Sequence, residues 1–285
     1  MNTIHCIPSL IIAAALSAAA ASCSHGSADK QQSAAPDSSE IQIPEADSAM
    51  NDIGAISQAI ASGNASRFAQ KCSYPIERPY PLRSIRDSAE MVSYFPVIAD
   101  DSLKRVVSQA KTSEWQSLGW RGWTLHNGEY IWYDGDVYAI TYLSPAENRM
   151  LDSLRRDEIN SLDPSLRGGW TPVTVLVSET DSTVYRIDRD TVASPDADSL
   201  SVRLAVYPPR SNRHKRPHRL LRGHSHAEGT AGARSYTFRD KRGTRASFID
   251  AQSSPDDTPT IIIVTAAGDS TATPVTPAYW RDLPE

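Results

Sequence analysis

From residue 170 onward the sequence alternates apolar and polar residues, and this period of two limits that part of the chain to β-strands. Every second residue is apolar over 173–177, 185–187 and 202–206. Tyr236 and Phe238 continue the alternation, and we expect the apolar run 260–265 to form a fully buried strand. The spacing of these segments predicts a small sandwich or barrel of about six strands, with a sandwich-like arrangement favoured.

The preceding part of the chain starts with a helical pattern. Ile53, Ile56 and Ile60 recur at the spacing that places them on one face of a helix. Residues 50–112 are therefore expected to be mainly helical. The stretch 73–81 is an exception because its three prolines are incompatible with regular helix.

Residues 115–143 are aromatic and suited to β-structure. Asn127-Gly128 and Asp134-Gly135 are typical of hairpin turns, since both residue types tolerate positive φ. The predicted antiparallel strands are 115–126, 129–134 and 137–143. This region therefore adds a three-stranded sheet to the helices before it.

A further helix is predicted immediately after this sheet. Ser144-Pro145-Ala146-Glu147 provides an N-cap residue, a proline at the first helical position and a glutamate at the third. The helix is expected to end near Leu162, and Gly168-Gly169 closes this part of the chain. The predicted domains are an α+β domain over 50–162 and a β-rich domain over 163–285.

The order of helices and aromatic strands over residues 50–143 resembles the NTF2-like fold, in which a curved antiparallel sheet wraps around helices. The phrase Ile53…Ala65-Ser-Arg-Phe68…Tyr74-Pro75 adds to the likeness. Tyr74-Pro75-Ile76, Gly119-Trp120-Arg121-Gly122-Trp123 and Tyr185-Arg186-Ile187-Asp188 together resemble uncharacterised exported bacterial lipoproteins. The resemblance implies an NTF2-like domain followed by a sandwich-like one, and it implies no activity.

Residues 1–22 resemble a secretory signal peptide. They contain no Lys, Arg, Asp or Glu, and the apolar run 10–21 is shorter than the roughly 20 residues that a membrane-spanning helix needs. Ala20-Ala21-Ser22-Cys23 resembles the lipobox, which implies that Cys23 receives diacylglycerol and an acyl chain such as palmitate. The alternative is ordinary secretion after Ala18-Ala19-Ala20. The lipobox predicts a protein anchored in the bacterial cell envelope, in the periplasm or at the outer membrane or cell surface.

The segment 23–49 is rich in Ser, Ala, Asp, Gln and Pro, and it is predicted to be a disordered tether. Cys72 is then left without a partner, because Cys6 belongs to the signal and Cys23 to the lipid. We expect Cys72 to be a small buried hydrophobic residue. A disulfide between Cys23 and Cys72 is the alternative.

Four tryptophans lie within 18 residues, between Trp115 and Trp132. One interpretation is core packing, since each ring buries a large area. The other is a concave pocket that stacks a sugar or another small flat ligand. The candidate ligand-binding residues of such a pocket are Trp120, Arg121, Trp123, His126, Glu129 and Trp132.

A basic segment interrupts a chain whose formal net charge is −5. No acidic residue occurs between Asp198 and Glu228, and six Lys or Arg residues lie within 210–222, where prolines predict a loop. The loop is either a solvated surface or a contact for an anionic envelope polymer or lipid headgroups. The candidate contact residues are Arg213, Lys215, Arg216 and Arg219. No nucleic-acid-binding motif is present, so nucleic acid is not an expected partner.

Neither a metal site nor a catalytic motif is predicted. His224 and His226 would share one face of a strand, but no carboxylate or thiol completes a ligand set at a known spacing. No cofactor is expected, and the oligomeric state is left open. The favoured function is non-enzymatic binding of a ligand or partner by a lipid-anchored envelope protein. The alternative is a hydrolase of envelope glycans that uses the tryptophan pocket and carboxylates such as Glu129.

Overall fold

The computed structural model describes residues 43–192, 199–228, 233–250 and 259–284. Residues 44–285 belong to one compact unit. The predicted signal peptide, Cys23 and the tether up to residue 42 lie outside the described residues. Among the helices that are described, none has the length and apolar character needed to cross a membrane.

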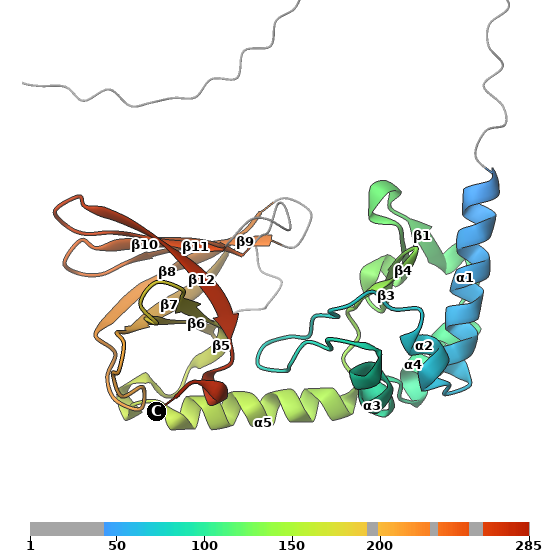
Figure 1. Ribbon diagram of the computed structural model, residues 1–285, viewed down its shortest axis with the longest axis horizontal. Coiled ribbons are helices and arrows are strands. Elements are labelled where there is room, and N and C mark those ends of the chain that lie inside the picture. The colour runs from blue at the N-terminus through green and yellow to red at the C-terminus, as the bar shows by residue number, and fades with distance from the viewer. Residues whose placement is uncertain (1–42, 193–198, 229–232, 251–258, 285) are drawn as a thin grey trace, which may run out of the picture. The chain divides into compact units, whose positions relative to one another are not determined.

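Helices dominate the first part of the described chain (Figure 1). They are α1 (Ile43–Ala61), α2 (Ala65–Ala69), α3 (Ser88–Ile98) and α4 (Asp101–Gln109). Asp87 and Asp100 cap α3 and α4 by accepting backbone N–H bonds of 2.9 and 2.8 Å. The predicted tether 23–49 is helical from Ile43 onward, and Pro44 is compatible with this because a proline fits the first turn of a helix.

A small antiparallel sheet follows α4. Its strands, in spatial order, are β1 (Trp115–Ser117), β2 (Trp123–Leu125), β3 (Ile131–Asp134) and β4 (Asp136–Ile140). The predicted strand 115–126 is wrong, because a 3-10 turn at Gly119–Arg121 divides it. Gly122 adopts φ 75°, and a Cβ at this position would lie 2.1 Å from the carbonyl oxygen of Tyr133. Only glycine therefore allows β2 to approach β3 here.

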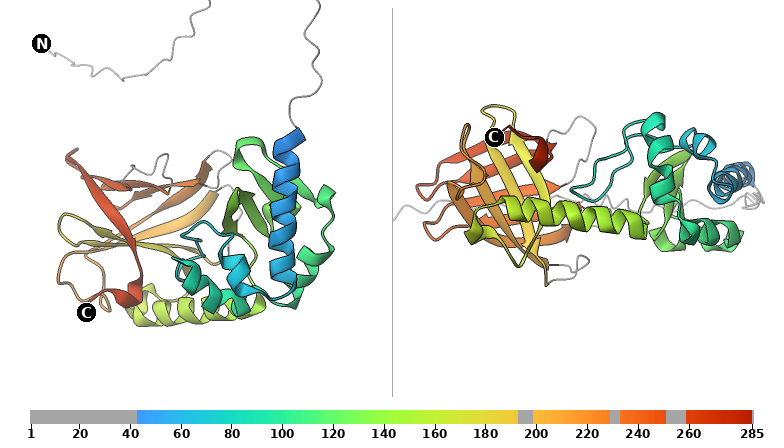
Figure 2. Two further views of the ribbon diagram at one scale, coloured as in Figure 1. Left: turned by 45° about the vertical axis from the view of Figure 1, so that its right-hand side comes forward. Right: turned by 90° about the horizontal axis from the view of Figure 1, so that it is seen from below.

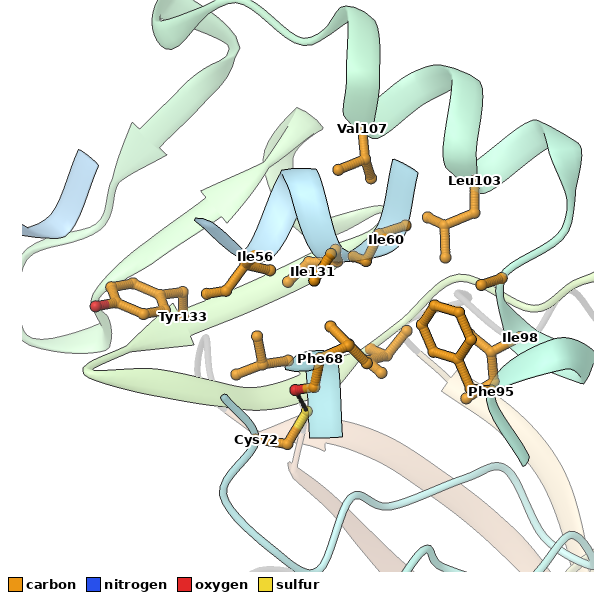
Figure 3. Packing of buried hydrophobic residues seen from close by; sticks show 14 of the residues in the cluster. Ile56, Ile60, Phe68, Cys72, Phe95, Ile98, Leu103, Val107, Ile131 and Tyr133 are labelled. Carbon is orange, nitrogen blue, oxygen red and sulfur yellow. Dashed lines mark hydrogen bonds between the residues drawn. The ribbon is translucent and has the colours of Figure 1, made fainter. Parts of the chain in front are cut away.

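The helices and the small sheet share one apolar core, shown in Figure 3. The labelled side chains come from α1 (Ile56, Ile60), α2 (Phe68), α3 (Phe95, Ile98), α4 (Leu103, Val107) and β3 (Ile131, Tyr133). Cys72 lies in this core as a free thiol, and its Sγ donates to the carbonyl of Phe68 at 3.4 Å. Burial raises the pKa of Cys72 to about 12. The prediction of a small buried hydrophobic residue is confirmed.

The predicted NTF2-like fold is wrong. Such a fold needs long, curved strands that wrap around helices, whereas β1 to β4 are three to five residues long. Strands this short cannot enclose a helix, so the helices cover the sheet instead. Most of the β-structure in the described residues belongs to a separate closed barrel.

Helix α5 (Pro145–Ser161) connects the small sheet to the barrel (Figures 1 and 2). The predicted capping box is present: the Glu147 N–H donates to Ser144 Oγ at 3.1 Å, and the Ser144 N–H donates to the Glu147 carboxylate at 3.3 Å. This arrangement satisfies two of the free N–H groups at the helix start. Glu147 is fully buried.

The described residues after α5 form a closed antiparallel barrel of eight strands. They are β5 (Trp170–Ser178), β6 (Val184–Asp190), β7 (Ser199–Tyr207), β8 (Arg219–Glu228), β9 (Ala233–Arg239), β10 (Arg245–Asp250), β11 (Thr260–Val264) and β12 (Ser270–Ala278). Each strand pairs with its sequence neighbours, and β12 pairs with β5 to close the ring. The sandwich-like arrangement is therefore wrong, because a sandwich would leave two separate sheets.

The predicted number of strands, about six, was too low, and the apolar alternation did not identify β8, β10 or β12. Strand β8 shows why. Its outward positions carry Arg222, His224 and His226, while its inward positions include Gly223 and Ser225, so the apolar alternation is hidden. A Cβ on Gly223 would lie 1.7 Å from the carbonyl oxygen of Thr237 in β9. The backbones of β8 and β9 thus approach closely at this point, which a side chain would prevent.

The expectation that β11 is buried throughout is wrong, because its side chains alternate between the inside and the outside of the barrel. Ile261 is completely buried and belongs to the cluster inside the barrel, whereas Ile262 is 40% exposed. The run was predicted to be buried throughout, but a barrel strand has one face toward the interior and one toward the outside. Ile262 therefore lies on the outer face of the barrel.

Candidate functional site

A cavity of about 1340 Å³ lies where α3, α5, the barrel and a loop of the helical part meet. We call it the cleft. The loop, residues 76–85, is closed at its base by two backbone hydrogen bonds of 2.9 Å between Ile76 and Ile85, both buried in the helical core. Cavities of this size accommodate organic ligands, so the cleft is the candidate functional site.

Arg78 attaches the 76–85 loop to the start of α5. Its guanidinium donates to both carboxylate oxygens of Glu147, at 2.9 and 2.8 Å, and to the carbonyl oxygens of Ile140 and Tyr142. Both side chains of the ion pair are almost completely buried. The two hydrogen bonds of this bidentate ion pair offset the free-energy cost of removing both charges from water.

Tyr80 attaches the same loop to the end of α5. Its hydroxyl donates to Glu158 at 2.9 Å and accepts the backbone N–H of Trp280 at 3.1 Å. Burial raises the pKa of the Tyr80 hydroxyl, so that it remains a donor to the carboxylate. Glu158 in turn accepts from Arg186 of β6 at 3.0 Å.

Arg186 continues this contact into the wall of the barrel. It donates to Asp188 at 2.8 Å, and Asp188 also accepts from Arg203 of β7 at 2.9 Å. The guanidinium of Arg186 stacks 4.9 Å from the centre of the Trp280 ring. Burial raises the pKa of Glu158 although Arg186 opposes the shift, so this carboxylate depends on the arginine for its charge.

Residues near the C-terminus form another wall of the cleft. The Tyr279 ring stacks on Tyr80 at 6.0 Å, and its hydroxyl accepts the backbone N–H of Ser84 at 3.1 Å. Arg83 forms an ion pair with Asp282, with donor–acceptor distances of 2.6 and 2.7 Å. The 76–85 loop is therefore held at its tip as well as at its base.

The cleft offers both apolar and charged surface to a ligand. Met150 of α5 and Ile249 of β10 line it and are 41% and 56% exposed. Arg281 also lines it, stacked 5.6 Å from the Tyr279 ring and without an ion pair to any described carboxylate. Such a wall suits a ligand with an apolar body and an anionic group.

The predicted tryptophan pocket is not assembled from its six residues. Trp120 is 82% exposed and stacks with Arg121, whereas Trp123 packs against the helical core. The Trp132 ring covers Gly128 and donates from Nε1 to its carbonyl oxygen at 3.2 Å. These rings therefore do not line one pocket. Of the two interpretations of the tryptophans, packing in the core fits Trp123 best.

The two remaining residues of that set lie beside the turn that follows β2. The His126 ring meets the Tyr130 ring edge-on at 5.4 Å, and its Nε2 lies 3.6 Å from Glu114. Glu129 is exposed after the turn. Neither residue lines the cleft.

The four predicted anionic-contact residues differ in burial. Arg213 is 6% exposed and donates to the carbonyl oxygens of Trp280, Leu283 and Pro284, and its guanidinium stacks 4.9 Å from the Trp280 ring. It holds the C-terminal segment in place rather than facing solvent. Lys215 and Arg216 are exposed, while Arg219 is partly buried at the start of β8.

His224 and His226 do share the outward face of β8, as the sequence predicts. Within the described residues, no three His, Cys, Asp or Glu side chains gather in a way that would hold a metal ion. His214 is used differently, since its Nδ1 forms a 2.7 Å hydrogen bond with the carbonyl of Ser161 at the end of α5.

The sequence did not indicate the cleft. Its main contributors, Tyr80, Met150, Ile249, Tyr279 and Arg281, are spread over 200 residues and form no motif. The three prolines near residue 80 predicted irregular structure, which was the one available signal that this segment is a loop. The loop's partners on α5 and near the C-terminus become visible only in the folded chain.

The chain matches no protein-family model, no curated protein and no solved structure.

Arg213 and Arg216 give a matched test of the basic loop. Arg213→Ala should lower the free energy of unfolding by about 3 kcal/mol, because the carbonyl groups of the C-terminal segment lose a buried charged donor. Arg216→Ala should change it by less than about 0.5 kcal/mol, since its side chain is 79% exposed. Urea unfolding of both variants measures the difference, and equal effects would contradict the structural role of Arg213.

Proposed function

We propose that this protein is a non-enzymatic binding protein of the bacterial cell envelope, attached by a lipid on Cys23, that holds an amphipathic organic ligand in the cleft. The ligand class is a molecule with an apolar or flat body and an anionic group. The observation that carries the proposal is the cleft itself, about 1340 Å³ in volume and bordered by exposed apolar side chains beside Arg281, which forms no ion pair with a described carboxylate.

The contacts around the cleft support binding rather than simple packing. Single exposed apolar side chains are common on protein surfaces, but Met150 and Ile249 both line the same cavity, and apolar surface gathered in a cavity favours ligand binding. The 76–85 loop is held by Arg78 and Tyr80, so the cavity exists before any ligand arrives. A preformed site loses less conformational entropy on binding, which favours a receptor for a small molecule.

The proposed location follows from residues 1–23. Their uncharged apolar run and the small residues before Cys23 are the features of an exported lipoprotein. A tether after Cys23 would leave the cleft accessible to molecules of the envelope. This part of the proposal is independent of the ligand and can fail separately.

Anilinonaphthalene sulfonate is a suitable probe, because it combines flat apolar rings with one anionic group. Wild-type protein should bind it at one saturable site. Arg281→Ser should weaken this binding about tenfold by removing a charge-assisted contact. Met150→Lys should weaken it to a similar or greater extent, because it places a flexible charged chain against the apolar wall. Dye fluorescence titration gives both dissociation constants.

Val92→Lys is the matched control for the dye experiment. Val92 is 37% exposed on α3, and it does not line the cleft. This variant should bind the dye as the wild type does. Equal binding by all four proteins, or equal loss in the control, would show that the dye does not report the cleft and would overturn the proposed site.

Cys23→Ser tests the anchor. The wild-type chain should incorporate labelled palmitate in a bacterial host and fractionate with membranes, whereas the variant should incorporate none. Fatty-acid labelling followed by fractionation measures both. Absence of label in the wild type would contradict the lipid anchor and leave ordinary secretion as the export route.

A further inference from the structure

We propose that the outer face of β8, β9, β10 and β11 is a docking surface for the phosphate-bearing headgroups of an anionic lipid bilayer. We call it the arginine face. The proposal concerns a second contact with the membrane, made by the folded protein itself. It depends neither on the lipid at Cys23 nor on the ligand of the cleft.

The arginine face is built on a row of arginines that the strand register places side by side. Arg203 of β7 is directly opposite Arg222 of β8, Arg222 is opposite Arg239 of β9, and Arg239 is opposite Arg245 of β10. Like charges at directly opposite positions of an antiparallel sheet are destabilising. A row of four is therefore unfavourable unless other groups compensate it.

Within the part of the chain that the structure describes, compensation exists at one end of the row only. Arg203 is buried and bonded to Asp188, and Trp170 stacks against Arg203 and Arg222 at 4.6 and 5.5 Å. Arg239 and Arg245 are exposed and form no ion pair with a described carboxylate. The repulsion between Arg239 and Arg245 would be relieved by binding of an anionic partner.

The neighbouring outward positions also favour an anionic partner. In the register of β8 to β10 they carry His224, His226, Ser235, Thr237 and Ser247, and the one described carboxylate among them is Glu228 at the end of β8. The turn after β9 adds Lys241 and Arg242. Its Asp240 carboxylate is occupied by the backbone N–H groups of Arg242 and Thr244, at 2.8 and 2.9 Å.

Exposed isoleucines distinguish a bilayer from a soluble anionic polymer. Ile262 of β11 lies opposite Ser247 of β10 and is 40% exposed. Ile249, two residues farther along β10, is 56% exposed and stands where this outer face borders the cleft. Both isoleucines stand on the same outer face as Arg239 and Arg245. Cations beside exposed aliphatic side chains suit an interface in which phosphates lie next to acyl chains. An anionic polysaccharide would match the arginines but has no acyl chains to cover the isoleucines.

Among the described residues, α5 does not cover the arginine face, which borders the cleft at Ile249. In Figures 1 and 2, β9, β10 and β11 lie on the side of the barrel away from α5. The buried charge network and Trp280 occupy the α5 side instead. A flat membrane can therefore approach β9 to β11 without meeting α5.

Vesicle sedimentation tests the proposal with residues 23–285 carrying Cys23→Ser, so that no lipid anchor contributes. The protein should bind vesicles of phosphatidylcholine with about one third phosphatidylglycerol, bind pure phosphatidylcholine far less, and be released by high salt. Arg239→Gln with Arg245→Gln should lower the partition coefficient about thirtyfold, given the usual contribution of two arginines near an anionic surface.

Arg149→Gln with Arg156→Gln is the control of equal charge change, because both arginines are exposed on α5. It should bind anionic vesicles as the parent does. The Arg239/Arg245 variant should melt at the same or a higher temperature, since repulsion across the strands is removed. Unchanged binding by this variant, equal loss in the control, or binding to dextran sulfate without binding to vesicles would overturn the proposal.

Discussion

Two buried glutamates on α5 hold the described parts of this protein together. Glu147 and Glu158 are eleven residues apart, about three helical turns, so they lie on the same side of the helix about 16 Å from each other. Each binds an arginine from a different part of the chain: Arg78 of the 76–85 loop and Arg186 of β6. The helix therefore sets the spacing between that loop and the barrel, and the cleft is the space that results.

Buried ion pairs of this kind are a poor source of stability but a strong source of specificity. Moving Glu158 and Arg186 out of water is costly, and a pair of apolar residues could fill the same volume at lower cost. The charges demand defined partners, however, and Tyr80, Asp188 and Trp280 provide contacts from three separate segments, although Nη2 of Arg186 has no hydrogen-bond partner among the described residues. These contacts favour one arrangement of loop, helix and barrel, which explains why a cavity bordered by exposed Met150 can persist.

Local features were predictable from the sequence, whereas the closure of the barrel and the long-range contacts of individual side chains were not. The capping box at Ser144 and the burial of Cys72 follow from nearest-neighbour chemistry, and both are confirmed. A sandwich was favoured over a barrel, and strands were missed; strand β8, for example, hides its period of two behind Gly223 and charged outward residues. Arg213 appeared to be one cation in a basic loop, but its partners lie about 70 residues away at the C-terminus.

Calorimetric unfolding tests most directly whether α5 couples the loop, the helical core and the barrel. The wild-type chain should unfold in one cooperative transition. Glu147→Ala and Glu158→Ala should each destabilise that same transition by about 3 kcal/mol or more, because each leaves a buried arginine without its carboxylate. Two wild-type transitions, one shifted only by the change at Glu147 and the other only by the change at Glu158, would contradict this account.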